Sequence, residues 1–264
     1  MKYSPTSINC YFTCPRQYYY KYIMKLPEVP NIHSLKGQII HKVIEKLFSN
    51  RKYVDPVEFV NKELDKLWNV SVLNLSKEDE EKHKKDARAI LTLFADSYKK
   101  KIEAMLLDEK FSDIDHIWNY LRPVMNEVNF DSDALGLTGR IDSIEIDKDG
   151  VVSLVDYKTS KKYRHHIRED YMRQIRLYAL LYYLENKKPP AYVILHFIRY
   201  GEIFHFPVTP DTIELAKKDL EFVKLNTCSI EMKDYPQNIT NFCEWCDYKE
   251  ECFGKKQKQE VLKK

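Results

Sequence analysis

Residues 139–159 read GRIDSIEIDKDGVVSLVDYKT, in which apolar and polar side chains alternate as they do along β-strands. Residues 147–151 (DKDGV) interrupt this alternation and suit a three-residue hairpin loop, a type I turn followed by Gly150 in the left-handed conformation. We therefore predict an antiparallel hairpin in which Asp142 lies directly opposite Asp156.

The two acidic residues of this hairpin share a face with basic neighbours. Because strand side chains alternate, the face that carries Asp142 and Asp156 also carries Arg140 and Lys158. Two opposed carboxylates near a core repel, so one stays protonated unless a cation lies between them. A divalent metal ion held by oxygen ligands removes this conflict. The alternative is a solvated patch of ordinary ion pairs, which adds little stability, and the hairpin alone leaves both explanations open.

Hydrophobic periodicity places further strands and helices around the hairpin. A helix is expected to begin near Leu35, and Thr209-Pro210 is typical of a helix start with threonine as the cap. The predicted strands are Val124–Phe130, Leu137–Ile146, Val151–Tyr157, Tyr192–Ile198 and Glu202–Val208, with a helix from about Arg168 to Glu185 between the third and the fourth. This order of elements indicates an α/β fold.

Composition divides the chain into five predicted segments. Residues 1–34 are aromatic and basic, and residues 35–54 form the first core helix. Residues 55–118 have a helical and highly charged pattern, which indicates an inserted helical subdomain. Residues 119–208 contain the predicted core, and residues 209–264 contain the last helix and a tail with three cysteines.

Length and composition limit the class of protein. A chain of 264 residues with 44% apolar residues can bury a sizeable core. We expect no membrane span, because no run approaches about 18 uncharged apolar residues, and no signal peptide. The expected location is the cytoplasm of a cell or of an infected host. Since 43 basic residues nearly balance 40 acidic ones, the net charge of +3 neither supports nor excludes a nucleic-acid partner.

The cysteines are unevenly distributed along the chain. They are Cys10, Cys14, Cys228, Cys243, Cys246 and Cys252. In a reducing compartment this pattern indicates metal ligation rather than disulfides. The three at 243, 246 and 252 have compact ligand spacing, and a fourth ligand must come from elsewhere. Spacing alone leaves a structural zinc and an iron-sulfur cluster both open, and Cys10 and Cys228 are expected to be ordinary buried thiols.

Two further groups of residues could contact nucleic acid. A basic patch suited to phosphates follows the hairpin and comprises Lys161, Lys162, Arg164, His165, His166 and Arg168. An aromatic group near the N-terminus could stack on single-stranded DNA and comprises Tyr11, Phe12, Tyr18, Tyr19, Tyr20 and Tyr22. Core packing explains most of these aromatic residues at least as well.

Two helices carry polar residues at helical spacing. On the first helix, Gly37, His41 and Glu45 are four residues apart and therefore lie along one side. Gln174 and Tyr178 share this spacing on the later helix. Taken singly, each has an ordinary explanation: a half-buried histidine, and an apolar helix face that carries a tyrosine.

Taken together, four segments match a known family. In chain order they are Gly37-x-x-x-His41, Gly139-Arg140-Ile141-Asp142, Asp156-Tyr157-Lys158 and Gln174-x-x-x-Tyr178. This ordered set resembles the motifs of RecB-like PD-(D/E)XK nucleases, including AddB-type nuclease domains and the CRISPR-associated iron-sulfur exonucleases. The resemblance runs from Tyr3 to Cys252. It implies a restriction-endonuclease-like core, a mixed central sheet flanked by helices, with a helical insertion.

The resemblance also implies roles for individual residues. His41, Asp142, Asp156 and the backbone carbonyl of Tyr157 would bind a catalytic Mg²⁺ or Mn²⁺ ion. Lys158 would position or polarise the attacking water and stabilise charge on the phosphate. Gln174 and Tyr178 would shape the site and contact DNA, and Glu127 would have a supporting role. The expected DNA-binding residues are Arg140, Lys161, Lys162 and Arg164.

The same resemblance favours an iron-sulfur cluster over zinc. In these nucleases, one N-terminal cysteine and three C-terminal cysteines bind a [4Fe-4S] cluster. Carried over to this chain, the ligands are Cys14, Cys243, Cys246 and Cys252, with Cys10 as the alternative to Cys14. The cluster would then staple the N- and C-terminal regions together across the nuclease core.

Three functional hypotheses follow. The first is a metal-dependent DNA exonuclease that acts on single strands or ends, in recombination, repair, replication or CRISPR adaptation. The second is a nuclease-inactive DNA-binding iron-sulfur module that supports a helicase, and the third is an electron-transfer protein. The intact set of Asp142, Asp156 and Lys158 favours the first, because the other two have no chemical need for it. Since no helicase motor fits in this length, unwinding would come from a helicase or CRISPR adaptation partner.

Overall fold

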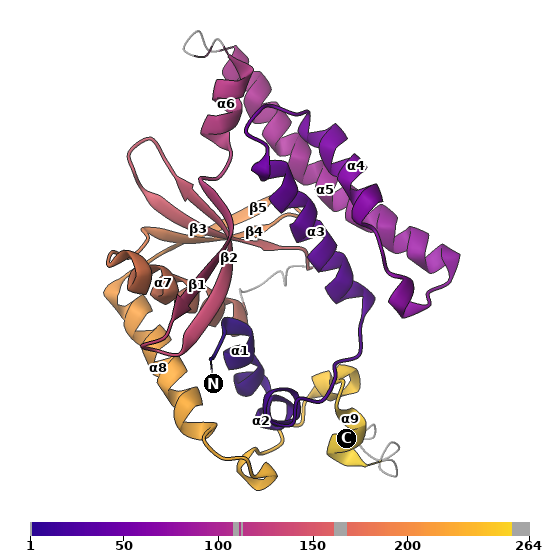
Figure 1. The fold of residues 1–264 in the computed structure, drawn as a ribbon, viewed down its shortest axis with the longest axis vertical. Helices are drawn as coiled ribbons and strands as arrows, with labels where there is room; N and C mark the ends of the chain where they lie inside the picture. The colour runs from indigo at the N-terminus through magenta and orange to yellow at the C-terminus, as the bar shows by residue number, and fades with distance from the viewer. Residues whose placement is uncertain (1, 108–110, 112, 161–167, 255–264) are drawn as a thin grey trace.

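The computed structural model describes residues 2–107, 111, 113–160 and 168–254, and these form an α/β fold as predicted. One sheet in the order β1-β2-β3-β4-β5 lies between helices (Figure 1). The β3–β4 pair is parallel and the other neighbouring pairs are antiparallel, so the sheet is mixed. The strands are β1 (Met125–Ser132), β2 (Leu137–Ile146), β3 (Val152–Lys158), β4 (Tyr192–Phe197) and β5 (Glu202–Pro207).

The β2–β3 hairpin has the predicted register, with Ile144 paired to Leu154. Its loop also has the predicted form. The Gly150 amide donates to the Asp147 carbonyl over 3.0 Å, and Gly150 has a φ of 76°, a conformation that glycine adopts without steric cost. This register carries the two acidic residues of the hairpin to the far end of the paired strands.

Helices cover both faces of the sheet. The predicted helix after the hairpin and the helix capped by Thr209 are both confirmed. Of the helices in the described part of the chain, none combines the length and the apolar character that a membrane crossing requires. The helices are α1 (Pro5–Thr13), α2 (Pro15–Tyr18), a π-helix (Tyr19–Ile23), α3 (Ile32–Ser49), α4 (Pro56–Leu67), α5 (Lys77–Leu106), α6 (Ile114–Leu121), α7 (Glu169–Asn186), α8 (Pro210–Asn226) and α9 (Lys249–Phe253), with 3₁₀ turns at Ser71–Leu73, Met232–Asp234 and Asn241–Trp245.

Each face of the sheet has its own core because strand side chains alternate. Leu154 packs on one face with side chains of α1, α7 and α8. Val155, its neighbour in β3, packs on the other face with α3, α4, α5 and α6. Since α7 connects the parallel strands β3 and β4, it crosses the first face, while α3 lies on the second. Residues of both helices can therefore meet at one end of β3.

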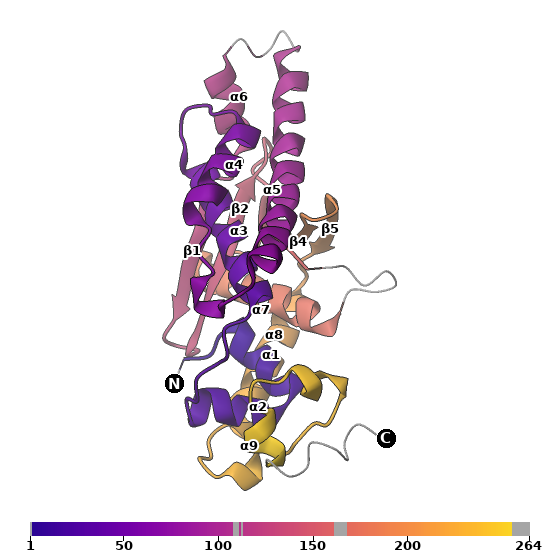
Figure 2. The same cartoon turned by 90° about the vertical axis from the view of Figure 1, so that its right-hand side faces the viewer.

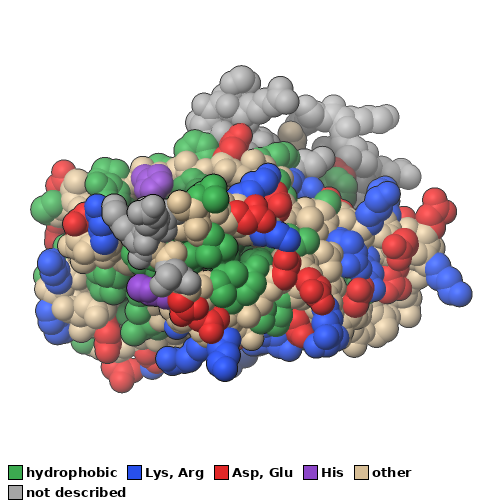
Figure 3. Space-filling model, turned by 90° about the horizontal axis from the view of Figure 1, so that it is seen from above, with side chains coloured by type: hydrophobic (Ala, Val, Ile, Leu, Met, Phe, Trp, Pro, Cys, Tyr) green, Lys and Arg blue, Asp and Glu red, His purple; other side chains and the backbone are tan. Residues whose placement is uncertain are grey.

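The second face is covered by a layer of long helices. Figure 2 shows α5, which has 30 residues, alongside α3 and α4. Asp55 and Ser76 cap α4 and α5, because their side chains accept hydrogen bonds from backbone amides in the first turns. Seen from above, acidic and basic side chains are interspersed on the surface with hydrophobic ones between them (Figure 3). This mixture agrees with the nearly balanced composition.

The N-terminal helices lie beside the C-terminal segment (Figures 1 and 2). The Arg16 Nε donates to the Tyr235 carbonyl over 2.7 Å, and the Tyr20 hydroxyl donates to the Glu251 carbonyl over 3.0 Å. Most of the N-terminal aromatic group packs in the core, as one of the two explanations left open by the sequence expected. The buried members are Tyr11, Tyr18, Tyr19 and Tyr20, while Phe12 and Tyr22 pack partly buried against the same core.

Candidate active site

Two carboxylates stand just beyond the last paired rung of β2 and β3. The last paired residues are Ser143 and Val155, and the next position on each strand is Asp142 and Asp156. Asp142 Oδ2 accepts a hydrogen bond from the Tyr157 amide over 2.8 Å, so its side chain continues the strand pairing. Asp156 is only 3% exposed. The hairpin thus places both carboxylates together at the edge of the core, as predicted.

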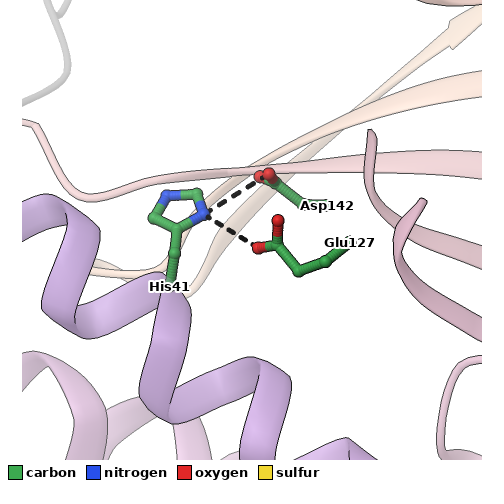
Figure 4. Close-up of side chains that lie close together, drawn as sticks. All are labelled: His41, Glu127 and Asp142. Carbon is green, nitrogen blue, oxygen red and sulfur yellow. Dashed lines mark ion pairs between the residues drawn. The ribbon is translucent and has the colours of Figure 1, made fainter. Parts of the chain in front are cut away.

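A histidine and a third carboxylate complete one group. His41 on α3 directs its Nδ1 toward Asp142 Oδ1 at 3.4 Å and toward Glu127 Oε1 at 3.9 Å (Figure 4). One ligand atom from each of the three residues lies within 4.8 Å of the others. Two carboxylate oxygens and an imidazole nitrogen are suitable donors for Mg²⁺ or Mn²⁺. The donor set therefore fits a divalent ion.

Glu127 is a member of this group that the sequence analysis understated. The pairs Asn126–Ser143 and Val128–Ile141 flank it, so Glu127 stands opposite Asp142 across β1 and β2. Its φ is 50°, which is uncommon for a residue with a side chain and marks local strain. The register of β1 against β2 would have identified this residue.

Glu127 is also paired to a basic residue of β2. Its Oε2 lies 2.6 Å from Arg140 Nε. Burial raises the pKa of Glu127 above its ordinary value, and the charge on Asp142 raises it further. Arg140, a predicted DNA-binding residue, opposes that shift without cancelling it.

The two central carboxylates differ in their electrostatics. Burial raises the pKa of Asp156 above its ordinary value; Lys158 opposes this shift, and the charge on Asp142 adds to it. Burial acts in the same direction on Asp142, but His41 and the Tyr157 amide outweigh it and lower the pKa of Asp142. Burial lowers the pKa of His41, and Asp142 more than reverses this, so the pKa of His41 is raised. The repulsion expected between the carboxylates of Asp142 and Asp156 is therefore present, because the charge on Asp142 raises the pKa of Asp156.

On the other side of Asp156, a chain of hydrogen bonds begins at the predicted catalytic lysine. Lys158 Nζ lies 2.6 Å from Asp156 Oδ2 and donates to Gln174 Oε1 over 2.6 Å. Gln174 Nε2 in turn donates to the Tyr178 hydroxyl over 2.8 Å. The Lys158 ammonium also lies 4.9 Å from the centre of the Tyr171 ring. The predicted pair on α7 thus fixes the lysine at the end of β3.

A glycine lies where α7 and α1 pack against the sheet. A Cβ added to Gly139 would meet Leu181 Cδ1 at 2.7 Å and Pro5 Cδ at 3.4 Å. The closer contact is with the end of a side chain, so Leu181 would have to repack to accept a Cβ here. Gly139 therefore allows side chains of α7 and α1 to pack tightly against β2.

The structure brings together most of the predicted site residues but divides them into two groups, where the resemblance implied one metal-binding set. His41 and Asp142 belong to the three-residue group with Glu127, whereas Asp156 pairs with Lys158. Of the predicted basic patch, Arg168 is described, and its Nε donates to Asp170 Oδ1 over 2.9 Å. The other members lie outside the described residues: Lys161, Lys162, Arg164, His165 and His166.

The four cysteines named above as cluster ligands line one cavity. Its volume is about 300 Å³, and it lies where the N-terminal helices meet the C-terminal segment. The Cys14 sulfur accepts the Asn238 amide at 3.5 Å, and the Cys252 sulfur accepts from Gln237 Nε2 at 3.0 Å. Cys243 and Cys246 complete the lining.

The four sulfurs line the cavity without forming a compact group of three. Zn–S bonds of about 2.3 Å in a tetrahedron place sulfurs about 3.8 Å apart. Among the described residues, no three of these cysteines have sulfurs within 4.8 Å of one another. Thiolates are ligands of structural zinc and of iron-sulfur clusters alike, so the donor chemistry fits either group.

Two cysteines were expected to be ordinary buried thiols. Cys10 packs against the core of the first sheet face, and burial raises the pKa of its thiol to about 12. For Cys228 the prediction is wrong, because it is exposed at the end of α8, where its thiol donates to the Lys224 carbonyl over 3.1 Å.

Comparison with known proteins supports this geometry. The model of the PD-(D/E)XK nuclease superfamily matches residues 2–253. The chain belongs to this superfamily. No curated protein matches the sequence significantly. The RecB-like and CRISPR-associated subfamilies suggested by the motifs stay a prediction.

One solved structure shows a similar fold. The structure of a candidate exonuclease from Eubacterium rectale aligns with a TM-score of 0.50 at 14% identity, over 94% of this chain and 87% of that one. The structure of SSO0001 aligns with a TM-score of 0.31 at 17% identity, over 82% of this chain and 94% of that one, a similarity too low to support an argument. At these identities the first comparison establishes the superfamily fold alone.

Proposed function

We propose that this PD-(D/E)XK protein is a metal-dependent deoxyribonuclease, an exonuclease that acts on single-stranded DNA or DNA ends. The observation that carries the proposal is the row of Glu127, Asp142 and Asp156 across three adjacent strands, with His41 at one side and Lys158 at the other. Recombination, repair, replication and CRISPR adaptation are the processes we propose for it. A helicase or CRISPR adaptation protein is the proposed partner.

The metal would be bound by the carboxylate side of this row. His41, Glu127 and Asp142 would hold it, with Asp156 and the Tyr157 carbonyl as the further ligands that the resemblance implies. When bound, a Mg²⁺ or Mn²⁺ ion supplies a nucleophile at neutral pH and cancels charge on the phosphate. His41 is compatible with Mn²⁺ as well as Mg²⁺.

The residues on the lysine side would orient the reacting groups. The Lys158 ammonium forms an ion pair with Asp156 and donates a hydrogen bond to Gln174, and the two contacts fix its direction. An ammonium has three N–H donors, so the third can serve the attacking water or the phosphate. Burial raises the pKa of Tyr178 well above its ordinary value, so its hydroxyl keeps its proton and can act as a donor. Such preorganised donors stabilise charge that develops in the transition state.

We propose a [4Fe-4S] cluster at the cysteine cavity, with zinc as the less favoured occupant. Cys14, Cys243, Cys246 and Cys252 would hold it. A cluster there would connect the N-terminal helices to the C-terminal segment and stabilise the folded state, because metal-binding free energy contributes to folding.

The test of the proposed function is direct. Full-length protein would be incubated with end-labelled single-stranded and duplex DNA in the presence of Mg²⁺, Mn²⁺ or EDTA. We expect progressive shortening from DNA ends with either metal and none with EDTA. Cutting that persists in EDTA, or no cutting of either substrate with either metal, would overturn the proposal.

A further inference from the structure

One carboxylate of the helical layer joins three separate segments of the chain. Asp86 on α5 accepts two hydrogen bonds from the Arg199 guanidinium, at 2.6 and 2.8 Å. Its Oδ2 also accepts from Lys36 Nζ over 2.5 Å. Lys36 lies on α3 and Arg199 lies just after β4. A single side chain therefore ties α5 to both of these elements.

The partners of Asp86 lead to the candidate active site. Arg199 Nε donates to the Thr159 carbonyl over 3.2 Å, and Thr159 directly follows Lys158. Lys36 lies five residues before His41 on the same helix. The contacts of Asp86 thus reach the segments that carry the proposed catalytic lysine and the proposed metal-binding histidine.

These contacts restrict movement of the chain segment that contains Lys158 and Thr159. The paired hydrogen bonds between a planar guanidinium and a carboxylate fix the orientation of both groups. The Lys36 side chain is 8% exposed and the Arg199 side chain 20%, whereas Asp86 is 33% exposed, so both partners are largely shielded from water and the carboxylate is partly so. Hydrogen bonds from Arg199 hold the pKa of Asp86 well below its ordinary value, which keeps the carboxylate charged.

We propose that Asp86 is a positioning residue of the nuclease site: through Arg199 it holds the Thr159 carbonyl, and with it the Lys158 ammonium, in the reactive position. This inference rests on the proposed function. Its expected signature is a lower turnover number with unchanged DNA affinity, because a displacement of about 1 Å at reacting groups can cost about 100-fold in rate.

The chain offers a matched control for Asp86→Asn. Glu63 on α4 is also a carboxylate of the helical layer, is 6% exposed, and pairs with Lys66 and, at 3.0 Å, with Lys46 of α3. Neither lysine adjoins the Lys158 segment. The lysines are 42% and 55% exposed, so this network is more solvated than that of Asp86, but Glu63→Gln removes a carboxylate of the same layer without touching the proposed positioning path.

The kinetic test compares kcat and KM of full-length variants on end-labelled DNA, together with their thermal midpoints. Asp86→Asn should lower kcat about tenfold or more with KM unchanged, while Glu63→Gln should keep the kcat of the parent. Arg199→Lys keeps the positive charge but loses the paired N–H donors of the planar guanidinium, so it should behave like Asp86→Asn. Equal losses of kcat in Asp86→Asn and Glu63→Gln, in proportion to lost stability, would overturn the proposal.

A second measurement does not depend on nuclease activity. Hydrogen exchange of the backbone amides of residues 158–160, measured without DNA or metal, should be faster in Asp86→Asn than in Glu63→Gln and the parent. Unchanged exchange would refute the positioning role. If the parent protein fails to cut DNA, the proposed function fails, and the exchange result still decides whether Asp86 positions this segment.

Discussion

The carboxylate site and the cysteine site of this protein are built in different ways. The carboxylates stand on adjacent strands, where the register fixes which residues face each other, and the Tyr157 amide holds Asp142 in place. The cysteines come from the two ends of the chain, and their sulfurs surround a cavity of about 300 Å³. The sheet preforms the first site, whereas a bound group would complete the second.

This difference predicts different consequences of damage. Loss of a group at the carboxylate site should affect chemistry more than folding, because the strands pair without it. Loss of a ligand at the cysteine site should affect folding more than chemistry, because a bound group there would connect distant segments. The four predictions that follow test this contrast.

The largest effect is expected at the lysine side of the carboxylate site. Lys158→Ala or Asp156→Ala should lower DNA cleavage by about 1000-fold, because each removes a group that orients or stabilises the reacting atoms. The fold should persist, since the raised pKa of Asp156 lets this carboxyl take up a proton when the lysine is absent. Single-turnover cleavage rates and thermal midpoints would check this. Undiminished cutting by either variant would exclude the assigned site.

The next effect is expected at the cysteine cavity. Protein purified without oxygen should be brown, show broad absorption at about 400 nm and contain iron. Cys246→Ser should bleach this colour and lower the thermal midpoint by about 5 °C or more, because cluster binding also drives folding. Asp156→Ala is the control and should keep the colour. Stoichiometric zinc in colourless protein prepared with iron supplied would contradict the cluster.

A smaller effect is expected from the metal-binding side of the carboxylate row. Glu127→Gln and His41→Ala should each raise the Mn²⁺ concentration for half-maximal cleavage by about tenfold. Arg140→Gln separates the two roles of Glu127, because it removes the ion pair and leaves the carboxylate. Titration of activity with Mn²⁺ would measure all three variants. If Arg140→Gln raises the Mn²⁺ concentration for half-maximal cleavage as much as Glu127→Gln does, loss of the ion pair rather than loss of a metal ligand explains the result.

The smallest effect concerns the sheet that supports the carboxylates. His196 on β4 pairs with Tyr157, and burial lowers the pKa of its imidazole from 6.5 to about 4. The unfolded chain therefore binds a proton at a higher pH than the folded chain, so stability is full above pH 6.5 and is lost as pH falls toward 4. His196→Gln should reduce this acid loss. Urea midpoints across this range would measure it, and identical pH slopes for both proteins would contradict it.

Local signals in the sequence were sufficient to predict part of the fold and site. The turn at Gly150 and the alternation on either side set the hairpin register, and this register placed Asp142 and Asp156 together. The four-residue spacing of Gln174 and Tyr178 likewise predicted that both lie on one face of α7, and the family resemblance assigned that face to the site. Each of these features depends on residues close in sequence or on one tight turn.

Other features depend on packing between distant segments and were not predicted. Glu127 enters the site through the pairing of β1 with β2 and through a positive φ that strand propensity disfavours. The contact between Asp86 and Arg199 joins residues 113 positions apart. The exposure of Cys228 follows from its position at the end of α8, which periodicity alone could not show.

The hydrogen bond from the Tyr157 amide to Asp142 Oδ2 has an evolutionary consequence. Asparagine at this position would still offer that amide an oxygen but would carry no charge, whereas alanine would offer neither. If Asp142 binds the catalytic metal as proposed, selection for folding and selection for chemistry act on the same side chain and tolerate different replacements. A descendant that loses catalysis and keeps its fold is then expected to carry asparagine at this position. The residue found here would therefore distinguish inactive copies from active ones.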